Sequence, residues 1–431
     1  MTCVSAKQGS DDGQGAARRG GVWRVPDFQR LWAAQSISET GTQIGQLAVP
    51  LLAIGALDAS ATELGFLSGA RMLPFLVLAL PAGALLDRIR RLPVLVVSDV
   101  CRALLLASVP VAYALDLLTF VQLYLAVLLV GVFTVAFDVA YQSYLPTLVR
   151  REDLADANAR LTASASAAEL AGPAAAGVLA GLLGAAATVL LDALSFLVSG
   201  LLCRAVRHRE PAPEPSAGVR RSLRKEVGEG LGFVLRHPVL RAVAGCAALL
   251  NLGSSMLTVL VTLYMVRELH YSSTMVGVIF SLGGAGLLGG ALCAGRVIDR
   301  LGYGRSITLG SVLCGVGLAV MPLASPELSL PFLLGGQLLF GFGVPLFNIA
   351  QVTLRQALTP DRLRGRMNAS MRFVIWSVIA VGGPVAGLLA ETIGMRGAIV
   401  VAAATGALAW PALVVSPVPA LRRLPQVPEP T

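Results

Sequence analysis

Charged residues are scarce in this sequence. They make up 14% of its 431 residues, against roughly 25% in ordinary soluble domains, while 55% of the residues are hydrophobic. The mean hydropathy is +0.73. Such a mixture cannot cover a protein with a water-soluble surface. The composition therefore predicts a polytopic membrane protein, in which the chain length reflects the number of membrane spans and not the number of soluble domains.

Cysteine and histidine are also sparse. The six cysteines are scattered, form no Cys-x-x-Cys pair, and have no spacing that indicates a disulfide or metal framework. The three histidines, His208, His237 and His270, lie in or beside loops. We find no metal-ligand cluster, nucleophile motif or phosphate-binding loop. The sequence therefore predicts a protein that is not an enzyme and that holds no cofactor or metal.

Basic residues are concentrated in alternate connections between the apolar runs. They lie near Arg90, Arg150, Arg220, Arg300 and Arg364, and the intervening connections hold few of them. This is the positive-inside pattern, which predicts a multi-pass protein of the cell membrane with both termini in the cytoplasm. It also accounts for the net charge of +9 without a nucleic-acid partner.

The two halves of the chain repeat one another. Gly83-Ala-Leu-Leu-Asp87-Arg88 matches Gly295-Arg-Val-Ile-Asp299-Arg300, about 212 residues later. At nearly the same offset, residues 58–65 match residues 270–277. Gly172-Pro173 followed by Gly177 likewise matches Gly383-Pro384 followed by Gly387. A repeat of half the chain length in so apolar a sequence predicts a transporter built from two parallel-oriented halves.

Apolar runs also give the number of spans. A hydrocarbon core requires about 20 mostly apolar residues per helix, and breaks in the pattern leave about twelve such runs. We therefore predict an all-α integral membrane fold with two pseudo-symmetric six-helix halves. The expected parts are a disordered cytoplasmic tail (1–27), the N-terminal half (28–205), a cytoplasmic linker (206–238), the C-terminal half (239–415) and a Pro-rich cytoplasmic tail (416–431).

The linker contains a helical pattern of its own. Leu223, Val227, Leu231 and Val234 recur at helical spacing, with basic residues beside them. This predicts an amphipathic helix. The pattern fits a helix lying on the cytoplasmic membrane surface, against lipid, and equally a short helix packed on the protein itself.

Several motifs resemble those of the major facilitator superfamily. The Gly-x-x-x-Asp-Arg element, found after the second and eighth spans, resembles the loop motif of that superfamily. Further stretches are similar to its enterobactin-exporter and macrolide-efflux branch: Arg71-Met-Leu-Pro74, Asp99-x-x-Arg102, Leu145-Pro146, Asp192-Ala-Leu-Ser195-Phe196 and His237-Pro238. The resemblance runs from about Phe28 to Val415. It implies the major facilitator fold and export of a drug or siderophore driven by a proton gradient.

The repeated loop element has the chemistry of a gate. A glycine lets a neighbouring helix approach closely, and the arginines can pair with carboxylates or lipid phosphates in one conformation and release them in another. The resemblance implies that Asp87 latches the cytoplasmic side of the outward-open state. In the alternative interpretation, the arginines only set topology. The candidate gating residues are Gly83, Asp87, Arg88, Arg91, Asp138, Asp299 and Arg300.

Four ionisable residues fall inside predicted spans of the N-terminal half: Glu39, Arg71, Arg102 and Glu169. Such groups are costly in a membrane and are candidates for function. Because the C-terminal half has no mid-span carboxylate, we predict a proton-carrying site in the N-terminal half, at Glu39 first and Glu169 second. The alternative is a permanent ion pair with Arg71 or Arg102. Asp99 and Arg102 are expected to form a structural pair on one helix face, and no role is assigned to Asp192.

Gly172-Pro173-x-x-x-Gly177 resembles the antiporter motif of the superfamily, which implies an exporter. The proline removes a backbone hydrogen bond and can bend its helix, so a packing kink is the alternative. The same pattern at Gly383-Pro384 supports a structural role in both halves.

In the superfamily, the first, fourth, seventh and tenth spans face a central cavity. Among the residues that these spans offer here, the candidates for contact with substrate are Gln43, Gln46, Phe133, Asn251 and Gln337. A mostly apolar lining with scattered amides suits a large amphiphilic molecule better than a sugar or small ion.

We therefore expect a monomeric exporter that binds a small-molecule substrate, protons and membrane lipids, and works by rocking of its two halves. Two alternatives stay open. One is an importer or uncoupled facilitator of the same fold, and the other is a membrane receptor or assembly protein that no longer transports.

Overall fold

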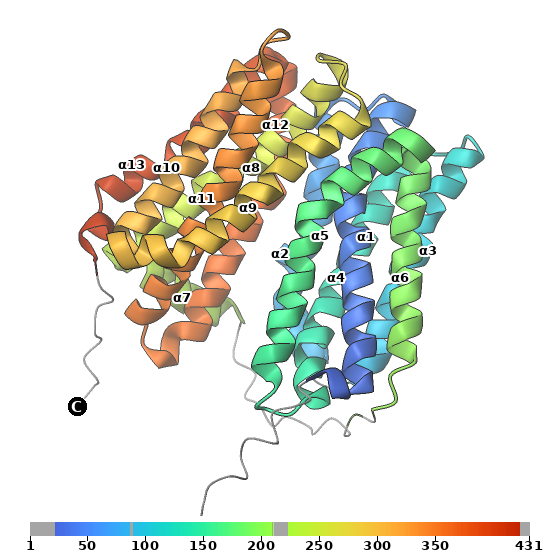
Figure 1. Cartoon of the computed structure of the whole chain (residues 1–431), viewed down its shortest axis with the longest axis horizontal. Helices are drawn as coiled ribbons and strands as arrows, with labels where there is room; N and C mark the ends of the chain where they lie inside the picture. The colour runs from blue at the N-terminus through green and yellow to red at the C-terminus, as the bar shows by residue number, and fades with distance from the viewer. Residues whose placement is uncertain (1–21, 87–88, 209, 211–222, 423–431) are drawn as a thin grey trace, which may run out of the picture.

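The computed structural model describes residues 22–86, 89–208, 210 and 223–422, and these are almost entirely helical. The N-terminal half comprises α1 (Pro26–Leu57), α2 (Ala61–Leu86), α3 (Arg91–Ala114), α4 (Phe120–Leu148), α5 (Leu154–Leu183) and α6 (Ala185–Arg204). After α7 (Leu223–Arg236), the C-terminal half comprises α8 (Pro238–Arg267), α9 (Ser273–Leu301), α10 (Tyr303–Val320), α11 (Ser329–Leu358), α12 (Asp361–Ala407) and α13 (Ala409–Val414). The two halves stand side by side (Figure 1).

In the described part of the chain, 11 helical segments are long and apolar enough to cross a membrane. The last of them, Leu363–Val414, contains a break at Gly394, whose φ of 79° and ψ of 163° are not helical. Two helices therefore meet within this segment. The prediction of an all-α fold with twelve spans in two halves is confirmed.

The sequence repeat is also a repeat of local structure. Asp58 and His270 adopt the left-handed conformation, with φ of 52° and 53°, and each lies in the connection that leads into the next helix. Ser60 and Glu63 then form a reciprocal cap, while the side chain of Ser272 accepts a hydrogen bond from the backbone N–H of Met275. The same turn therefore starts the second helix of each half.

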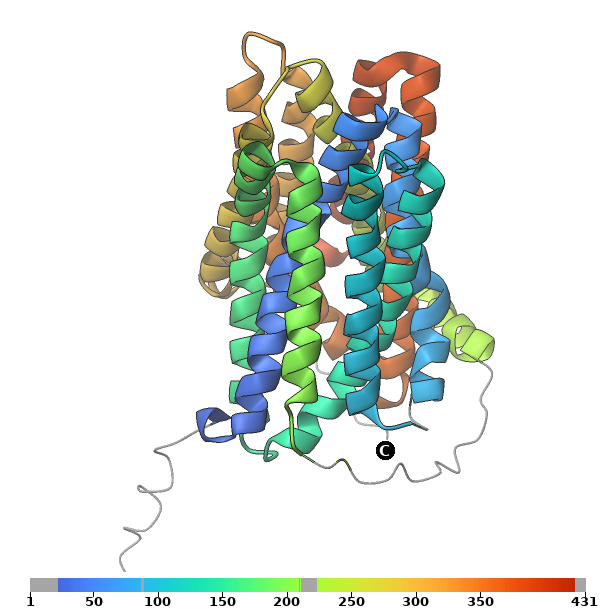
Figure 2. The same ribbon diagram turned by 90° about the vertical axis from the view of Figure 1, so that its right-hand side faces the viewer.

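We call the end of the bundle that carries Pro26, Arg204 and Leu223 the linker end, and the end that carries Asp58 and His270 the opposite end. The described chain begins at the linker end (Figure 2). It also ends there, because Leu421 accepts a hydrogen bond from the backbone N–H of Gly304 at the start of α10. The hairpins that join α1 to α2 and α8 to α9 lie at the opposite end.

The most extensive contacts between the halves are those of α2 with α12 and of α5 with α9. The repeated glycines lie in these contacts. A Cβ atom on Gly177 would be 2.8 Å from the Cα atom of Gly277, and one on Gly65 would collide with the carbonyl oxygen of Gly383. Only glycine permits so close an approach of two backbones. The halves are therefore closely packed towards the opposite end, and α5 and α9 diverge towards the linker end (Figure 1).

The ordered part of the chain extends beyond the predicted halves at both ends. Val22–Arg24 form a 3₁₀ helix inside the region expected to be a disordered tail, because Val22 is buried and Trp23 packs edge-on against Trp32. At the other end, the backbone N–H of Gly304 donates to the carbonyl oxygen of Leu421 at 2.8 Å. Residues 416–422 of the expected Pro-rich tail are thus ordered against α10.

Helix α7 packs on the protein, which decides between the two alternatives left open for the linker. Val234 is 2% exposed and lies in a cluster with Met367 and Met371 of α12. Glu229 forms an ion pair with Arg366, also on α12. These contacts attach the linker helix to the C-terminal half.

Candidate functional site

A cavity of about 680 Å³ lies between the two halves. All six helices of the N-terminal half, α1 to α6, line it from one side, and α8, α9 and α11 line it from the other. Four of the predicted substrate contacts are among its lining residues: Gln43, Gln46, Asn251 and Gln337. Aromatic and aliphatic side chains dominate the rest of the wall. Its volume falls in the range of small-molecule sites, roughly 300–1,000 Å³.

The ionisable groups of the cavity wall are Arg71 on α2, Glu169 on α5 and Asp192 on α6. All three belong to the N-terminal half, and the described residues of the C-terminal half contribute only amides, hydroxyls and apolar groups to the wall. No ion pair among the described residues joins Arg71 to a carboxylate, although the charges of Asp192 and Glu39 act on its guanidinium. The cavity therefore has one wall with charged groups, from the N-terminal half, and one uncharged wall, from the C-terminal half.

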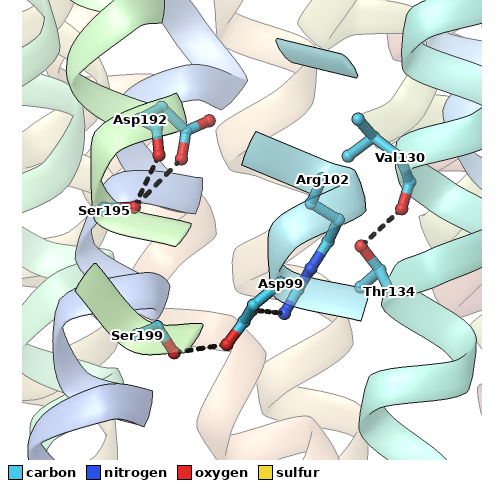
Figure 3. A network of polar contacts seen from close by, with 7 residues as sticks. All are labelled: Asp99, Arg102, Val130, Thr134, Asp192, Ser195 and Ser199. Carbon is cyan, nitrogen blue, oxygen red and sulfur yellow. Dashed lines mark hydrogen bonds and ion pairs between the residues drawn. The ribbon is translucent and has the colours of Figure 1, made fainter. Parts of the chain in front are cut away.

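Asp192 is a member of this site that the sequence left without a role. Its side chain is 5% exposed and lies against Gly41 and Gly45 of α1, where any Cβ atom would collide with the carboxylate or with Ser195. The Ser195 hydroxyl donates to the backbone carbonyl of Asp192 at 2.7 Å, and it lies 3.5 Å from the Asp192 carboxylate (Figure 3). Two glycines on α1 thus provide the space for a buried carboxyl group beside the cavity.

Arg102 is held in a different buried network. It forms an ion pair with Asp99, and the Ser199 hydroxyl donates to the other Asp99 oxygen at 2.7 Å (Figure 3). The Arg102 guanidinium also lies over two aromatic rings, 4.4 Å from the centroid of Phe137 and 4.3 Å from that of Phe196. The expected pair of Asp99 and Arg102 is therefore present, and Arg102 has no ion pair with Glu39 or Glu169.

Glu39 faces a second, smaller pocket of about 220 Å³ between α1, α4 and α5. It is absent from the lining of the central cavity, but it accepts a hydrogen bond of 2.9 Å from the side-chain amide of Gln43, which does line it. Glu39 and Glu169, the two predicted proton carriers, therefore lie in different spaces.

Comparison with known proteins assigns the fold to a family. The sequence profile described as Major Facilitator Superfamily matches residues 31–374 and 243–431. The chain belongs to the Major Facilitator Superfamily. The multidrug efflux pump Tap of Mycobacterium tuberculosis is 28% identical over 429 residues, which cover 94% of this chain and 96% of Tap. The enterobactin exporter EntS of Citrobacter koseri is 24% identical over 396 residues, which cover 90% of each chain. The predicted resemblance to the exporter branch of the superfamily is confirmed.

Solved structures show the same superfamily architecture. A bacterial homologue of the iron transporter ferroportin in an inward-facing state is 20% identical, with 92% of this chain and 99% of that chain covered and a TM-score of 0.75. The outward-facing state of such a homologue has a TM-score of 0.60 at 22% identity, with 90% and 98% covered.

The superfamily loop motif at the linker end is described in part. Asp87 and Arg88 lie outside the described residues, and Gly83 lies within α2. Arg91 forms an ion pair of 2.8 Å with Glu210, and Glu210 also accepts the backbone N–H of Arg91 at 2.6 Å. The start of α3 is thus tied to the beginning of the linker.

The other predicted gating residues lie apart from one another. Asp299 and Arg300 are exposed at the linker end of α9, and no ion pair joins either to another described residue. Asp138, on α4, has no ion pair among the described residues but is within electrostatic reach of Arg102 and Arg372.

Phe133, the fifth predicted substrate contact, lies on α4 but outside the set of cavity-lining residues. The next residue, Thr134, does line the cavity, and its hydroxyl donates to the Val130 carbonyl at 2.8 Å (Figure 3).

The antiporter-like motif of α5 touches both the other half and the cavity. Pro173 lines the cavity, and its carbonyl oxygen and Gly177 contact Gly277 on α9. Gly172 faces α1, where a Cβ atom would collide with the Cβ atom of Gln43. The motif therefore brings three elements close together, which fits a role in packing.

An ion pair that the sequence did not indicate closes the opposite end. Arg267, at the end of α8, pairs with Asp58, at the end of α1, and so joins the two halves. Asp58 is 95% exposed, so the pair contributes only about 0–1 kcal/mol to stability. Asp58→Asn is therefore expected to leave the thermal unfolding temperature nearly unchanged.

Crosslinking tests whether this end must open during transport. In a background without the six native cysteines, the variant with Asp58→Cys and Arg267→Cys is expected to lose ethidium transport when a short bifunctional methanethiosulfonate reagent links the two thiols. A reductant should restore it. Asp58→Cys alone is the control. Continued transport by the crosslinked protein would show that the halves need not separate here.

Proposed function

We propose that this protein is a proton antiporter that exports an amphiphilic small molecule across the cell membrane by alternating access. The central cavity carries the proposal. It has the volume and the apolar wall that suit a drug-sized amphiphile, and it contains Arg71, Glu169 and Asp192. Ionisable groups inside a membrane are costly and mark pathways for ions or substrates. Their confinement to one half separates the ion-coupling half from a largely neutral half.

The names of the relatives support export as the direction of transport. Tap is described as a multidrug efflux pump and EntS as an enterobactin exporter, and each aligns with at least 90% of this chain. The proposed substrates are accordingly a drug, a macrolide-like antibiotic or a siderophore. Because two carboxyl groups and one guanidinium lie on the cavity wall, an amphiphile with a positive charge is favoured.

The linker end is proposed to face the cytoplasm, with both chain termini on that side and lipid around a monomer. Arg91, Arg150, Arg204 and Arg366 lie at this end, as the positive-inside pattern requires. The close contacts between halves lie towards the opposite end, and the higher TM-score is with the inward-facing homologue. Both observations support an inward-facing state in which substrate enters from the cytoplasm.

Proteoliposomes that contain a pH-sensitive dye test the proposal. With a proton gradient imposed, ethidium, erythromycin or enterobactin is expected to move against proton flux, and Glu39→Gln is expected to reduce that flux about tenfold or more. Glu391→Gln, at an exposed carboxyl near the opposite end, is the matched control.

Each other result selects a different function. Movement of a compound without proton flux would contradict antiport and identify an uncoupled facilitator. Uptake in the direction of the proton gradient would identify an importer. A folded protein that moves none of the compounds would favour a receptor or assembly role.

A further inference from the structure

The small pocket beside Glu39 is lined mainly by polar side chains. Only Leu161 and Ala165 among its lining residues are apolar; the others are Gln35, Ser36, Glu39, Tyr141, Asn158, Thr162 and Ser164. Three buried oxygens on these side chains have no hydrogen-bond partner in the described protein: Oε1 of Gln35, Oγ of Ser36 and the hydroxyl of Tyr141. Buried polar atoms are nearly always satisfied by protein or water. At roughly 30 Å³ per water molecule, a pocket of about 220 Å³ has room for several.

Glu39 connects this pocket to the substrate cavity through one hydrogen bond. Glu39 lines the pocket, and Gln43, one helical turn further along α1, lines the cavity. The side-chain amide of Gln43 donates to Oε1 of Glu39 at 2.9 Å. Gln43 is therefore the group through which the small pocket and the cavity are in direct polar contact.

The backbone at Gln43 is held in place, so its side chain must respond to a change at Glu39. Gly172 on α5 packs against Gln43 so closely that a Cβ atom at Gly172 would lie 3.3 Å from the Gln43 carbonyl carbon. A carboxylate only accepts hydrogen bonds, whereas a protonated carboxyl group also donates one. An amide has a donating and an accepting end. Protonation of Glu39 therefore favours rotation of the Gln43 amide, which changes the group that the cavity meets.

The charge on Glu39 also acts on groups of the neighbouring helices. These are Arg71 on α2, Asp138 and Tyr141 on α4, and Glu169 on α5. Tyr141 shares the small pocket, whereas Arg71 and Glu169 line the cavity. Three acids and one base are therefore within electrostatic reach of Glu39, and a change in its charge also acts directly on the cavity wall.

We propose that the small pocket is a hydrated proton-binding site separate from the substrate cavity, and that Gln43 transmits the protonation of Glu39 to the substrate. This inference rests on the proton antiport proposed above. Proton and substrate then exclude one another through the Gln43 amide rather than by competition for one carboxyl group. Gln43 is accordingly a positioning residue that acts through Glu39.

Infrared titration of the full-length protein in lipid tests the hydrogen bond without any substrate. The protonated-carboxyl band that Glu39→Gln removes belongs to Glu39. Gln43→Met has nearly the same length but no N–H donor, and it is expected to shift the frequency of that band. Gln46→Met is the matched control, because Gln46 lines the cavity on the same helix and has no hydrogen bond to Glu39.

Ethidium binding, measured by fluorescence across a range of pH, tests the transmission. The affinity of the wild type is expected to change about 5- to 150-fold between acid and alkaline pH, the usual span of coupling between two sites. In Gln43→Met the ratio should fall to the ratio measured in Glu39→Gln, which keeps only the direct effect of the cavity carboxyl groups, and in Gln46→Met it should be retained. Gln43→Leu serves if Gln43→Met does not fold.

Three results would overturn the proposal. The first is a wild type with no titrating band that Glu39→Gln removes, and the second is a Glu39 band that Gln43→Met leaves unchanged. The third is an acid-to-alkaline ratio of ethidium affinities that is as large in Gln43→Met as in the wild type. Failure of antiport itself is distinguishable, because it shows as absent proton flux in wild-type proteoliposomes and leaves the band shift measurable.

Discussion

Asp192→Asn is expected to weaken the binding of ethidium and tetraphenylphosphonium, two amphiphilic cations, about tenfold or more at alkaline pH, where carboxyl groups are ionised. A tenfold change corresponds to roughly 1.4 kcal/mol, and loss of one buried charge partner usually costs more than that. Asp192 lines the cavity, and it is one of two carboxyl groups there, against the guanidinium of Arg71. Asparagine keeps the shape that Gly41 and Gly45 accommodate, so the change removes charge rather than packing.

Two controls separate charge from structure in this experiment. Ser195→Ala removes the hydroxyl beside Asp192 and leaves the carboxyl group, so cation binding should change little. A neutral amphiphile should bind Asp192→Asn as it binds the wild type. Equal affinity of the variant and the wild type for both cations would show that the Asp192 charge does not contribute to substrate binding.

The sequence predicted features of this fold that depend on local pattern. Twelve apolar runs and two half-length repeats require only hydropathy and self-similarity to detect, and both correspond to structure. The equivalence of 58–65 and 270–277 appears as a left-handed residue followed two residues later by a capping serine in each half. The repeated glycines at 65 and 277 lie in equivalent contacts between the halves. These features are set by short segments and were therefore predictable.

The direction in which a side chain points was less predictable than its depth. Counting residues places Glu39 and Glu169 within the membrane, but the structure places one in a side pocket and the other in the cavity. Phe133 and Thr134 illustrate the cause, because adjacent residues on a helix point about 100° apart. A small error in helix rotation moves a residue out of the cavity lining.

Asp192 was missed for another reason. The signal for its role lies on a helix about 150 residues earlier in the sequence, where Gly41 and Gly45 leave the space that its side chain fills. Small residues are common in membrane helices, so neither glycine indicates a partner by itself. The pairing of α1 with α6 had to be known before the carboxyl group could be placed beside the cavity.

Asp99→Ala is expected to destabilise the protein by about 3–5 kcal/mol, because it leaves the Arg102 guanidinium buried without a counter-charge. Asp99 is 0% exposed and Arg102 is 3% exposed, so water cannot solvate the remaining charge. Contacts with the rings of Phe137 and Phe196 offset only part of the loss, about 2 kcal/mol when desolvated. The thermal unfolding temperature, measured by size-exclusion chromatography after heating, should fall by about 10 °C.

A double variant decides whether the unpaired charge is the cause. Asp99→Leu combined with Arg102→Met replaces the pair by apolar side chains of similar size, which is often neutral for stability, so much of the lost stability should return. Ser199→Ala is added to the double variant because the Ser199 hydroxyl donates to Asp99 and would otherwise be left without an acceptor. If the double variant is as unstable as Asp99→Ala, then the packing around α3 and α6, and not the neutralisation of Arg102 by Asp99, is what stabilises this region. Recovery of stability would show that Arg102 has no essential structural role. The double variant could then be used to test whether this network, unlike the cavity residues, can be removed without loss of transport.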